Sequence, residues 1–135
     1  MNILVIDGQG GGIGKQLVTA IKTAIPLSAI TAIGTNSAAT SVMLKAGADH
    51  VATGENAVRV GCKTADIITG TIGIVIADSL LGEITPAMAS AIGQSGAKKV
   101  LIPVNLCDNI IIGVPDLSVS KLIQTAVSEI KKLHS

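Results

Sequence analysis

The sequence predicts an α/β fold: a three-layer sandwich built on a mostly parallel sheet of five strands, with one antiparallel strand added at an edge. Short apolar runs alternate with segments of helical periodicity, the pattern of parallel strands joined by crossover helices. Glycine and proline residues mark the turns between them. Because domains hold about 100–200 residues, we expect one domain spanning residues 1–135.

The first half of the chain alternates strands and helices with clear boundaries. Residues 3–6 are continuously apolar, as in a strand buried on both faces. Residues 12–25 place apolar side chains three and four positions apart, which predicts a helix that ends before Pro26. A second strand, a helix, a weak third strand and a short helix follow at residues 29–33, 37–46, 50–52 and 56–62.

The second half contains one ambiguous segment. After a fourth strand at residues 66–69, residues 72–81 fit either a continued strand or a buried helix, and we favour the helix. A threonine cap followed by proline begins a helix over residues 85–94. The remaining expected elements are a strand at residues 100–104, an antiparallel edge strand at 110–112 and a helix at 117–133.

The composition excludes several classes of function. Without Phe, Tyr or Trp, the chain has no tyrosine acid or base and no aromatic platform for single-stranded nucleic acid. Its net charge of +1 argues against a nucleic-acid partner. With no basic leader and no apolar run near the roughly 20 residues of a membrane span, we expect a cytoplasmic protein without a membrane partner. Cys62 and Cys107 lie outside any redox motif, so we expect reduced, buried thiols, and neither histidine has metal-ligand spacing.

A glycine cluster between the first strand and the first helix is the strongest functional signal. Residues 8–15, called the glycine loop below, have the sequence Gly-Gln-Gly-Gly-Gly-Ile-Gly-Lys. Without Cβ atoms, such a loop lets a ligand approach its backbone, and the first N–H groups of the helix point toward an anion there. We therefore expect the loop to bind a phosphate group. The alternative is a tight turn that binds nothing.

The glycine loop resembles known phosphate loops without matching any of them fully. Gly8, Gly12 and Gly14 have the GxxxGxG spacing of short-chain dehydrogenases, so the domain resembles Rossmann-like nucleotide-binding domains. The tyrosine of those enzymes is missing. The dinucleotide fingerprint GxGxxG fails at Ile13, and the P-loop pattern GxxxxGK[ST] fails at its first glycine and at its Mg²⁺-binding hydroxyl. NAD(P) and a nucleoside triphosphate both stay candidate cofactors.

Ligands of open α/β sheets bind outside the carboxyl ends of the strands, where small, polar and glycine-rich loops gather in this chain. The expected binding residues are Asp7, Gly8, Gly10, Gly11, Gly12, Ile13, Gly14, Lys15, Thr35, Asn36, Ser37, Thr69, Gly70, Thr71 and Gly73. Asn105 lies at the same edge. Asp7 would hold Mg²⁺ or a ribose hydroxyl, or cap the turn. After the second strand, where an NAD site offers an acid to the ribose, the chain has none, which weakens the case for NAD.

Three segments together resemble a known family over nearly the whole chain. They are residues 1–15, residues 52–56 (Ala-Thr-Gly-Glu-Asn) and residues 82–88 (Gly-Glu-Ile-Thr-Pro-Ala-Met). The chain resembles the small bacterial family called domain of unknown function 3842. This resemblance implies a stand-alone bacterial protein, and it carries over neither a ligand nor a catalytic residue.

Three hypotheses about function follow from these observations. In the first, the chain binds a nucleotide or another phosphorylated metabolite at the glycine loop, with residues 69–73 closing the neighbouring side. In the second, it is a Mg²⁺-dependent, P-loop-like NTPase or phosphoryl-transfer enzyme that uses Asp7, Lys15 and Asp78. In the third, it is a non-catalytic interaction or regulatory subunit whose exposed sheet edge pairs with a second copy in a homo-oligomer.

Overall fold

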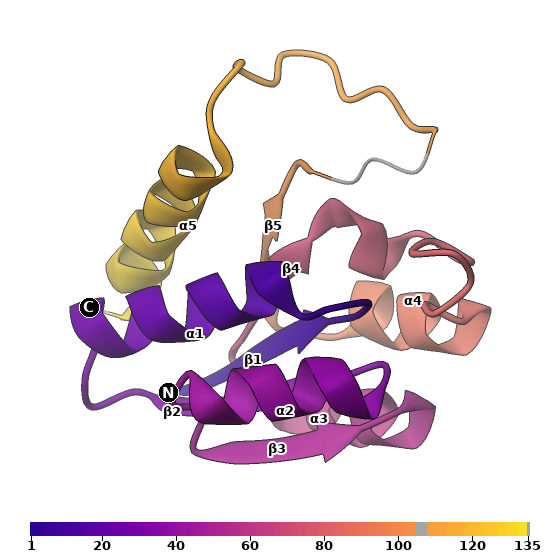
Figure 1. Ribbon diagram of the computed structural model, residues 1–135, viewed down its shortest axis with the longest axis horizontal. Coiled ribbons are helices and arrows are strands. Elements are labelled where there is room, and N and C mark those ends of the chain that lie inside the picture. Colours follow the sequence, from indigo (N-terminus) through magenta and orange to yellow (C-terminus); the bar gives the residue numbers. More distant parts are fainter. Residues whose placement is uncertain (105–107, 135) are drawn as a thin grey trace.

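The computed structural model describes residues 1–104 and 108–134, and in them it shows an α/β fold with a five-stranded sheet in the order β3-β2-β1-β4-β5 (Figure 1). All four strand pairs are parallel. The strands are β1 (Asn2–Asp7), β2 (Ala29–Gly34), β3 (His50–Thr53), β4 (Ile67–Thr71) and β5 (Lys98–Ile102). The α-helices are α1 (Gly12–Ala24), α2 (Ser37–Lys45), α3 (Glu55–Thr64), α4 (Pro86–Gln94) and α5 (Val119–His134). The expected α/β class and parallel sheet are confirmed.

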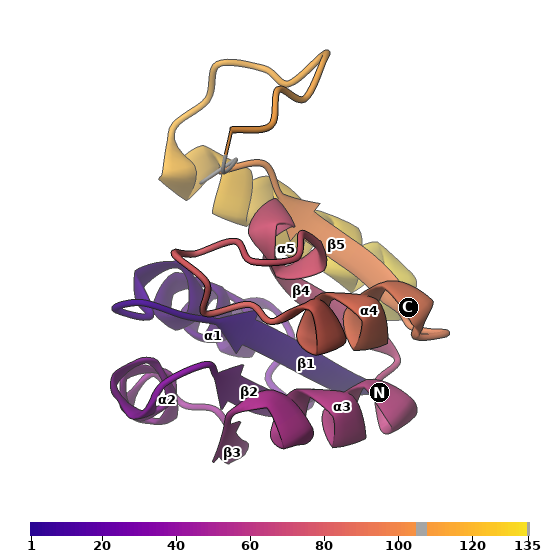
Figure 2. The same ribbon diagram turned by 90° about the vertical axis from the view of Figure 1, so that its right-hand side faces the viewer.

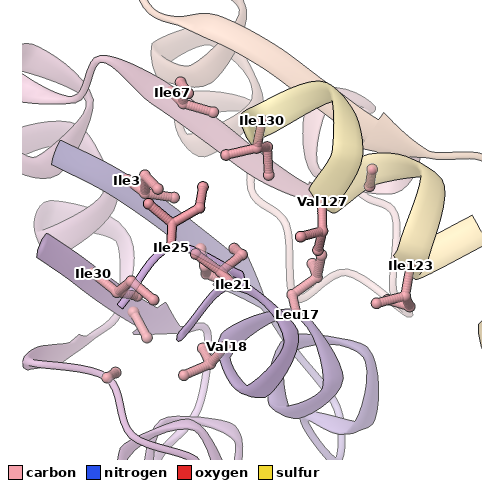
Figure 3. Packing of buried hydrophobic residues seen from close by; sticks show 14 of the residues in the cluster. Ile3, Leu17, Val18, Ile21, Ile25, Ile30, Ile67, Ile123, Val127 and Ile130 are labelled. Atoms are coloured by element: carbon pink, nitrogen blue, oxygen red, sulfur yellow. The ribbon is translucent and has the colours of Figure 1, made fainter. Parts of the chain in front are cut away.

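Helices cover both faces of the sheet because successive strand residues point to opposite sides. Ile3 and Val5 of β1 pack in a core cluster with α1 and α5, whereas Leu4 and Ile6 pack in a second cluster with α3 and α4 (Figure 2). Figure 3 shows the first cluster, in which the apolar stripes of α1 and α5 meet over the sheet. Odd-numbered residues of β1 therefore face α1, and this parity includes Asp7 at the end of the strand.

The helix favoured for residues 72–81 is seen only at the start of the segment. The segment forms a short 3₁₀ helix, η1 (Ile72–Val75), followed by a series of turns that leads to α4. Asp78, Leu80 and Leu81 have φ values of 65°, 54° and 56°. A right-handed helix cannot continue through such residues, and neither can a strand. The apolar content of the segment is explained by burial of Ile74 and Leu80 in the second cluster.

The expected antiparallel strand at residues 110–112 is also not seen. Ile110 and Ile112 are 86% and 90% exposed, and they lie in a segment that stands away from the sheet between β5 and α5 (Figure 1). β5 ends directly before Pro103, which has no N–H group to continue a ladder. The chain thus leaves the sheet at that point.

Of the two cysteines, Cys62 has a free thiol in the second core cluster, and burial raises its pKa. Cys107 and Asn105 lie outside the described residues. Within residues 1–104 and 108–134, no helix combines the length and apolar character needed to cross a membrane.

Candidate functional site

Asp7 organises the glycine loop between β1 and α1. Its Oδ1 atom accepts a hydrogen bond from the Gly8 N–H at 2.8 Å, and its Oδ2 atom accepts one from the Gly14 N–H at 2.7 Å. The carboxylate thereby satisfies one of the four N–H groups that the first turn of a helix leaves unpaired. Burial raises the pKa of Asp7, the bonds from Gly14 and Gly8 oppose that rise, and the charge of Glu83 adds to it.

Three glycines of the loop are required by close packing. A Cβ atom on Gly8 would lie 2.6 Å from the Thr35 hydroxyl oxygen, and one on Gly14 would lie 2.5 Å from the Met43 sulfur. A Cβ atom on Gly11 would lie 2.9 Å from the backbone of α2, and the φ of Gly11 is +74°, which favours glycine. The fold itself therefore explains these three positions.

Gly10 and Gly12 are different, because nothing in the described structure requires glycine there. A Cβ atom at either position would meet no other atom within 4 Å, and neither residue has a positive φ. Glycine loses more conformational freedom on folding than alanine does. The two residues leave the backbone of the loop open on its outer side.

The same stretch of the loop carries unpaired donors. Within the described residues, the backbone N–H groups of Gly10, Gly12 and Ile13 make no hydrogen bond, whereas the N–H groups of Gly11 and Lys15 donate to carbonyl groups of the loop at 2.9 and 2.8 Å. The loop borders a depression of about 330 Å³ lined by residues 7–13, Gln16 and Val119. No lysine or arginine is among these lining residues.

A buried hydroxyl without a partner lies on the neighbouring strand. The register pairs Ile3 with Ile67 and Val5 with Thr69, so Thr71 lies one strand away from Asp7 and on the same face of the sheet. Thr71 is 1% exposed, and its Oγ1 atom has no hydrogen-bond partner in the described part of the chain. An unpaired buried polar group is destabilising by about 1–3 kcal/mol, which makes Thr71 a candidate to bond a ligand.

Other predicted residues of β4 and η1 are engaged within the protein. The Thr69 hydroxyl donates to the Val100 carbonyl at 2.7 Å. A Cβ atom on Gly70 would lie 2.5 Å from the Ile6 carbonyl oxygen, so close strand contact explains this glycine. The Gly73 carbonyl accepts a hydrogen bond from the Ser79 hydroxyl. These residues shape the edge of the sheet beside Thr71.

The predicted polar residues after β2 surround a carboxylate that the sequence did not reveal. Glu83, from the turns between η1 and α4, reaches the carboxyl end of β2. Its Oε1 atom accepts hydrogen bonds from the Thr35 hydroxyl at 2.6 Å, the Gln9 N–H at 2.8 Å and the Asn36 side-chain amide at 2.8 Å. These bonds, led by that from Thr35, lower the pKa of Glu83, so it is ionised at neutral pH.

Asn36 and Ser37 begin α2 at this edge. The Asn36 side-chain oxygen caps the helix by accepting a hydrogen bond from the Ala39 N–H at 2.9 Å, and Ser37 is the first helical residue. No spacing rule could have linked Glu83 to this site, because 48 positions separate it from Thr35. Its position within one of the segments that carry the family resemblance is the one sequence signal that pointed toward it.

Asp7, Lys15 and Asp78, the residues predicted for phosphoryl transfer, are not joined by a hydrogen bond or ion pair within the described residues. Lys15 lines a groove between α1 and α5, not the depression at the glycine loop. Asp78 is exposed in the turns after η1, and no hydrogen bond or ion pair joins it to Asp7 within the described residues. In the same part of the chain, no three His, Cys, Asp or Glu side chains are grouped so that they could hold a metal ion.

Comparison with known proteins gives a match over almost the entire sequence to one family. The model of the family described as domain of unknown function (DUF3842) matches residues 2–135. No curated protein sequence matches the chain.

Two solved structures have a similar arrangement of elements at low sequence identity. An NADPH-dependent quinone oxidoreductase from Escherichia coli is 14% identical with a TM-score of 0.41, and the match covers 76% of this chain and 46% of that one. This chain thus spans less than half of the oxidoreductase chain. A dodecameric FMN-dependent UbiX-like decarboxylase from Escherichia coli O157:H7 is 16% identical with a TM-score of 0.44, and the match covers 97% of this chain and 76% of that one.

Proposed function

The chain belongs to the DUF3842 family, and we propose that it binds a nucleotide or another phosphorylated metabolite at the carboxyl edge of the sheet, with a phosphate group on the glycine loop. The observation that carries the proposal is the combination of open backbone and unpaired donors at the start of α1. The N–H groups of Gly10, Gly12 and Ile13 have no partner in the described structure, and Gly10 and Gly12 have no packing reason to be glycine.

The strand order supports this position for a ligand. The chain proceeds from β1 through β2 to β3 on one side of the sheet and then crosses to β4 and β5 on the other. Ligands of open α/β sheets bind at such a switch point, outside the carboxyl ends of the two strands where the direction reverses. Here those strands are β1 and β4, which end at Asp7 and Thr71. The free donors and the unpaired hydroxyl therefore flank the same switch point.

The electrostatics of the site set a condition on the phosphate. A hydrogen bond to a charged group contributes about 1.5–3 kcal/mol, and the dipole of α1 adds about 0.3–1 kcal/mol for an anion at its N-terminus. The Asp7 carboxylate opposes this attraction when it is ionised. Because burial raises the pKa of Asp7, its neutral form is more accessible than that of an exposed carboxyl group. An anion on the loop would raise that pKa further, so binding would be coupled to uptake of a proton.

Isothermal titration calorimetry with pyrophosphate, ADP and NAD⁺, each with and without Mg²⁺, tests the proposal. We expect at least one of them to bind the natural protein without Mg²⁺, since the proposed contacts of the phosphate are to backbone N–H groups, which need no cation. The Gly10→Ala/Gly12→Ala variant should lose that binding, because two methyl groups would cover the open backbone. Gly93→Ala is the matched control: Gly93 lies in α4, and a Cβ atom there also meets nothing within 4 Å. Full binding by the double variant, or no binding of any probe, would contradict the proposal.

Association between copies of the chain is a second candidate function, favoured by one observation. The segment between β5 and α5 exposes two isoleucines, Ile110 and Ile112, whose apolar surface a contact between copies would bury. Sedimentation velocity should show a homo-oligomer that Ile110→Ser/Ile112→Ser disrupts. A monomer at all concentrations would exclude this second function and leave the first untouched.

A further inference from the structure

Glu83 places an acid at the end of β2 although the sequence following β2 contains none. In dinucleotide-binding α/β domains, an acidic residue at this position hydrogen-bonds the hydroxyl groups of a ribose. Here the residues after β2 are Thr35, Asn36 and Ser37. The Thr35 and Asn36 side chains donate hydrogen bonds to the Glu83 carboxylate and so hold it at the end of β2. The acid reaches the required position from a remote part of the chain.

The two oxygen atoms of Glu83 are in different situations. Oε1 accepts three hydrogen bonds, from the Gln9 N–H and the side chains of Thr35 and Asn36. Oε2 makes no hydrogen bond within the described residues, and the side chain is half-buried. Three donors therefore fix the carboxylate through one oxygen and leave the other as a pre-oriented acceptor. An ionised carboxylate oxygen only accepts hydrogen bonds, so it is suited to bind a hydroxyl group of a ligand, which can donate one.

The turns that carry Glu83 are held in an unfavourable backbone conformation. Leu80 and Leu81 have φ values of 54° and 56°, which bulky L residues rarely adopt. Leu80 is buried beside Gly8, and the Gly82 N–H bonds the Asp78 and Ser79 carbonyls. Residues with such unusual φ values cluster at functional sites, and they persist only where the surrounding structure stabilises them. Here they position the Glu83 carboxylate beside the glycine loop.

Glu83 and the open donors are neighbours on the loop. The Gln9 N–H donates to Glu83, and the next N–H, that of Gly10, is free of any partner in the described residues. A phosphate on Gly10 and Gly12 would thus lie close to the carboxylate, as the 5′-phosphate of a nucleotide lies close to its ribose. Among the described residues, no Lys or Arg forms an ion pair with Glu83 or alters its pKa. A second phosphate attached to the ribose would therefore meet a negative charge without a compensating cation.

We propose that Glu83 selects the sugar of the ligand: the site takes a ribonucleotide, the free Glu83 oxygen accepts a hydrogen bond from its ribose, and a 2′-phosphorylated ribose is rejected. This inference rests on the proposed phosphate-binding function of the glycine loop and adds the class of ligand to it.

Two pairs of probes test this selection by calorimetry, NAD⁺ against NADP⁺ and ADP against 2′-deoxy-ADP. We expect the natural protein to bind NAD⁺ and ADP about tenfold or more tightly than their counterparts, as a hydrogen bond to a charged group implies. In Glu83→Gln both ratios should fall toward one. Glu55→Gln is the matched control, because Glu55 lies at the same edge and bonds the Thr85 hydroxyl instead of the loop. Its ratios should equal those of the natural protein.

The outcomes separate this inference from the proposed function. If the natural protein binds pyrophosphate but shows no preference for NAD⁺ over NADP⁺ or for ADP over its deoxy form, the sugar role of Glu83 is wrong and phosphate binding stands. If none of the probes binds, both fail. If a folded Glu83→Gln variant keeps both ratios, Glu83 does not select a sugar. The two ratios measured on the natural protein test the selection even if the variant does not fold.

Discussion

Alanine substitutions at two neighbouring glycines, Gly11 and Gly12, should have opposite effects on stability. Gly11 has φ +74°, and an L residue in that region costs about 1–2 kcal/mol. An added Cβ atom would also lie 2.9 Å from the Ala39 Cα atom and 3.1 Å from the Ala39 carbonyl oxygen, which belong to the backbone of α2 and cannot rotate away. Overpacking of this kind costs about 1–3 kcal/mol. We therefore expect Gly11→Ala to lose about 2–5 kcal/mol of the free energy of unfolding.

Gly12→Ala should instead stabilise the protein. A Cβ atom on Gly12 meets nothing within 4 Å, and Gly12 begins α1 without a positive φ. The gain should be about 0.4–1 kcal/mol, because alanine has less conformational freedom to lose on folding. The same methyl group would project over the open backbone, so the more stable variant should bind pyrophosphate more weakly.

Urea unfolding followed by far-ultraviolet circular dichroism measures both effects, since the chain has no aromatic residue for fluorescence. The midpoint should move in opposite directions for the two variants while the slope with denaturant stays unchanged. Gly93→Ala, in the open part of α4, controls for the general effect of alanine in a helix. A destabilised Gly12→Ala, or a Gly11→Ala variant as stable as the natural protein, would refute the division of the glycines into packing and open positions.

Three further predictions concern the core, the two carboxylates and the thiol. Ile130→Ala should lose about 2–5 kcal/mol of the free energy of unfolding, because Ile130 is fully buried in the first core cluster. Leu133→Ala should lose much less, because the Leu133 side chain is 40% exposed. Chemical denaturation of the two variants compares these losses. The pKa of Glu83 is lowered, so its contribution to the free energy of unfolding should be present above its ordinary pKa of 4.5 and be lost as pH falls further. Glu83→Gln should therefore differ in stability from the natural protein mainly at neutral pH. Asp7 should behave oppositely, because its pKa is raised: its contribution to the free energy of unfolding should be greatest below the ordinary pKa of 3.8 and be lost as pH rises through the raised pKa. Urea midpoints of the natural protein and of Asp7→Asn, compared across the acidic range, test this direction, and the opposite trend would contradict it. Cys62 should react slowly with iodoacetamide in the folded protein and rapidly in urea, because burial in the folded protein raises the pKa of its thiol. Mass spectrometry of the peptide that contains Cys62 measures both rates. Equal rates would place the thiol outside the core.

Most of the fold was predictable because its signals are local. The apolar run of β1 and the helical periodicity of α1 depend on residues close together in sequence, and Pro26 follows the end of that helix as expected. The Thr85 hydroxyl accepts a hydrogen bond from the Met88 N–H, which is the cap that a threonine before proline predicts. Such features need no knowledge of the tertiary structure.

Residues 72–81 and 110–112 were not predictable because tertiary context decides them. Leucine gives no local signal for a positive φ, yet Leu80 adopts one while its side chain enters the core. Ile110 and Ile112 have the composition of a strand, but a strand forms only if a partner edge accepts its hydrogen bonds, and the chain leaves the sheet at Pro103.

In the candidate site, too, some residues could be predicted from the sequence and others depend on tertiary contacts. The glycine loop was evident from its composition, and Thr71 was predicted as part of the loop after the fourth strand, although β4 extends to include it. Which glycines serve packing and which leave the backbone open depends on α2 and Met43, which lie elsewhere in the sequence. Glu83 was missed because its role exists only where the turns after η1 meet the end of β2.

Two-dimensional ¹H–¹⁵N NMR spectra recorded during titration with ADP test the phosphate site most directly. The amide signals of Gly10, Gly12 and Ile13 should shift most, because their N–H groups are free in the described structure. The Gly14 amide should shift less, because it already donates to Asp7. Unchanged loop amides, or shifts centred on the cavity of about 410 Å³ at the C-terminal ends of α3 and α4, would contradict the assignment of the glycine loop as a phosphate site.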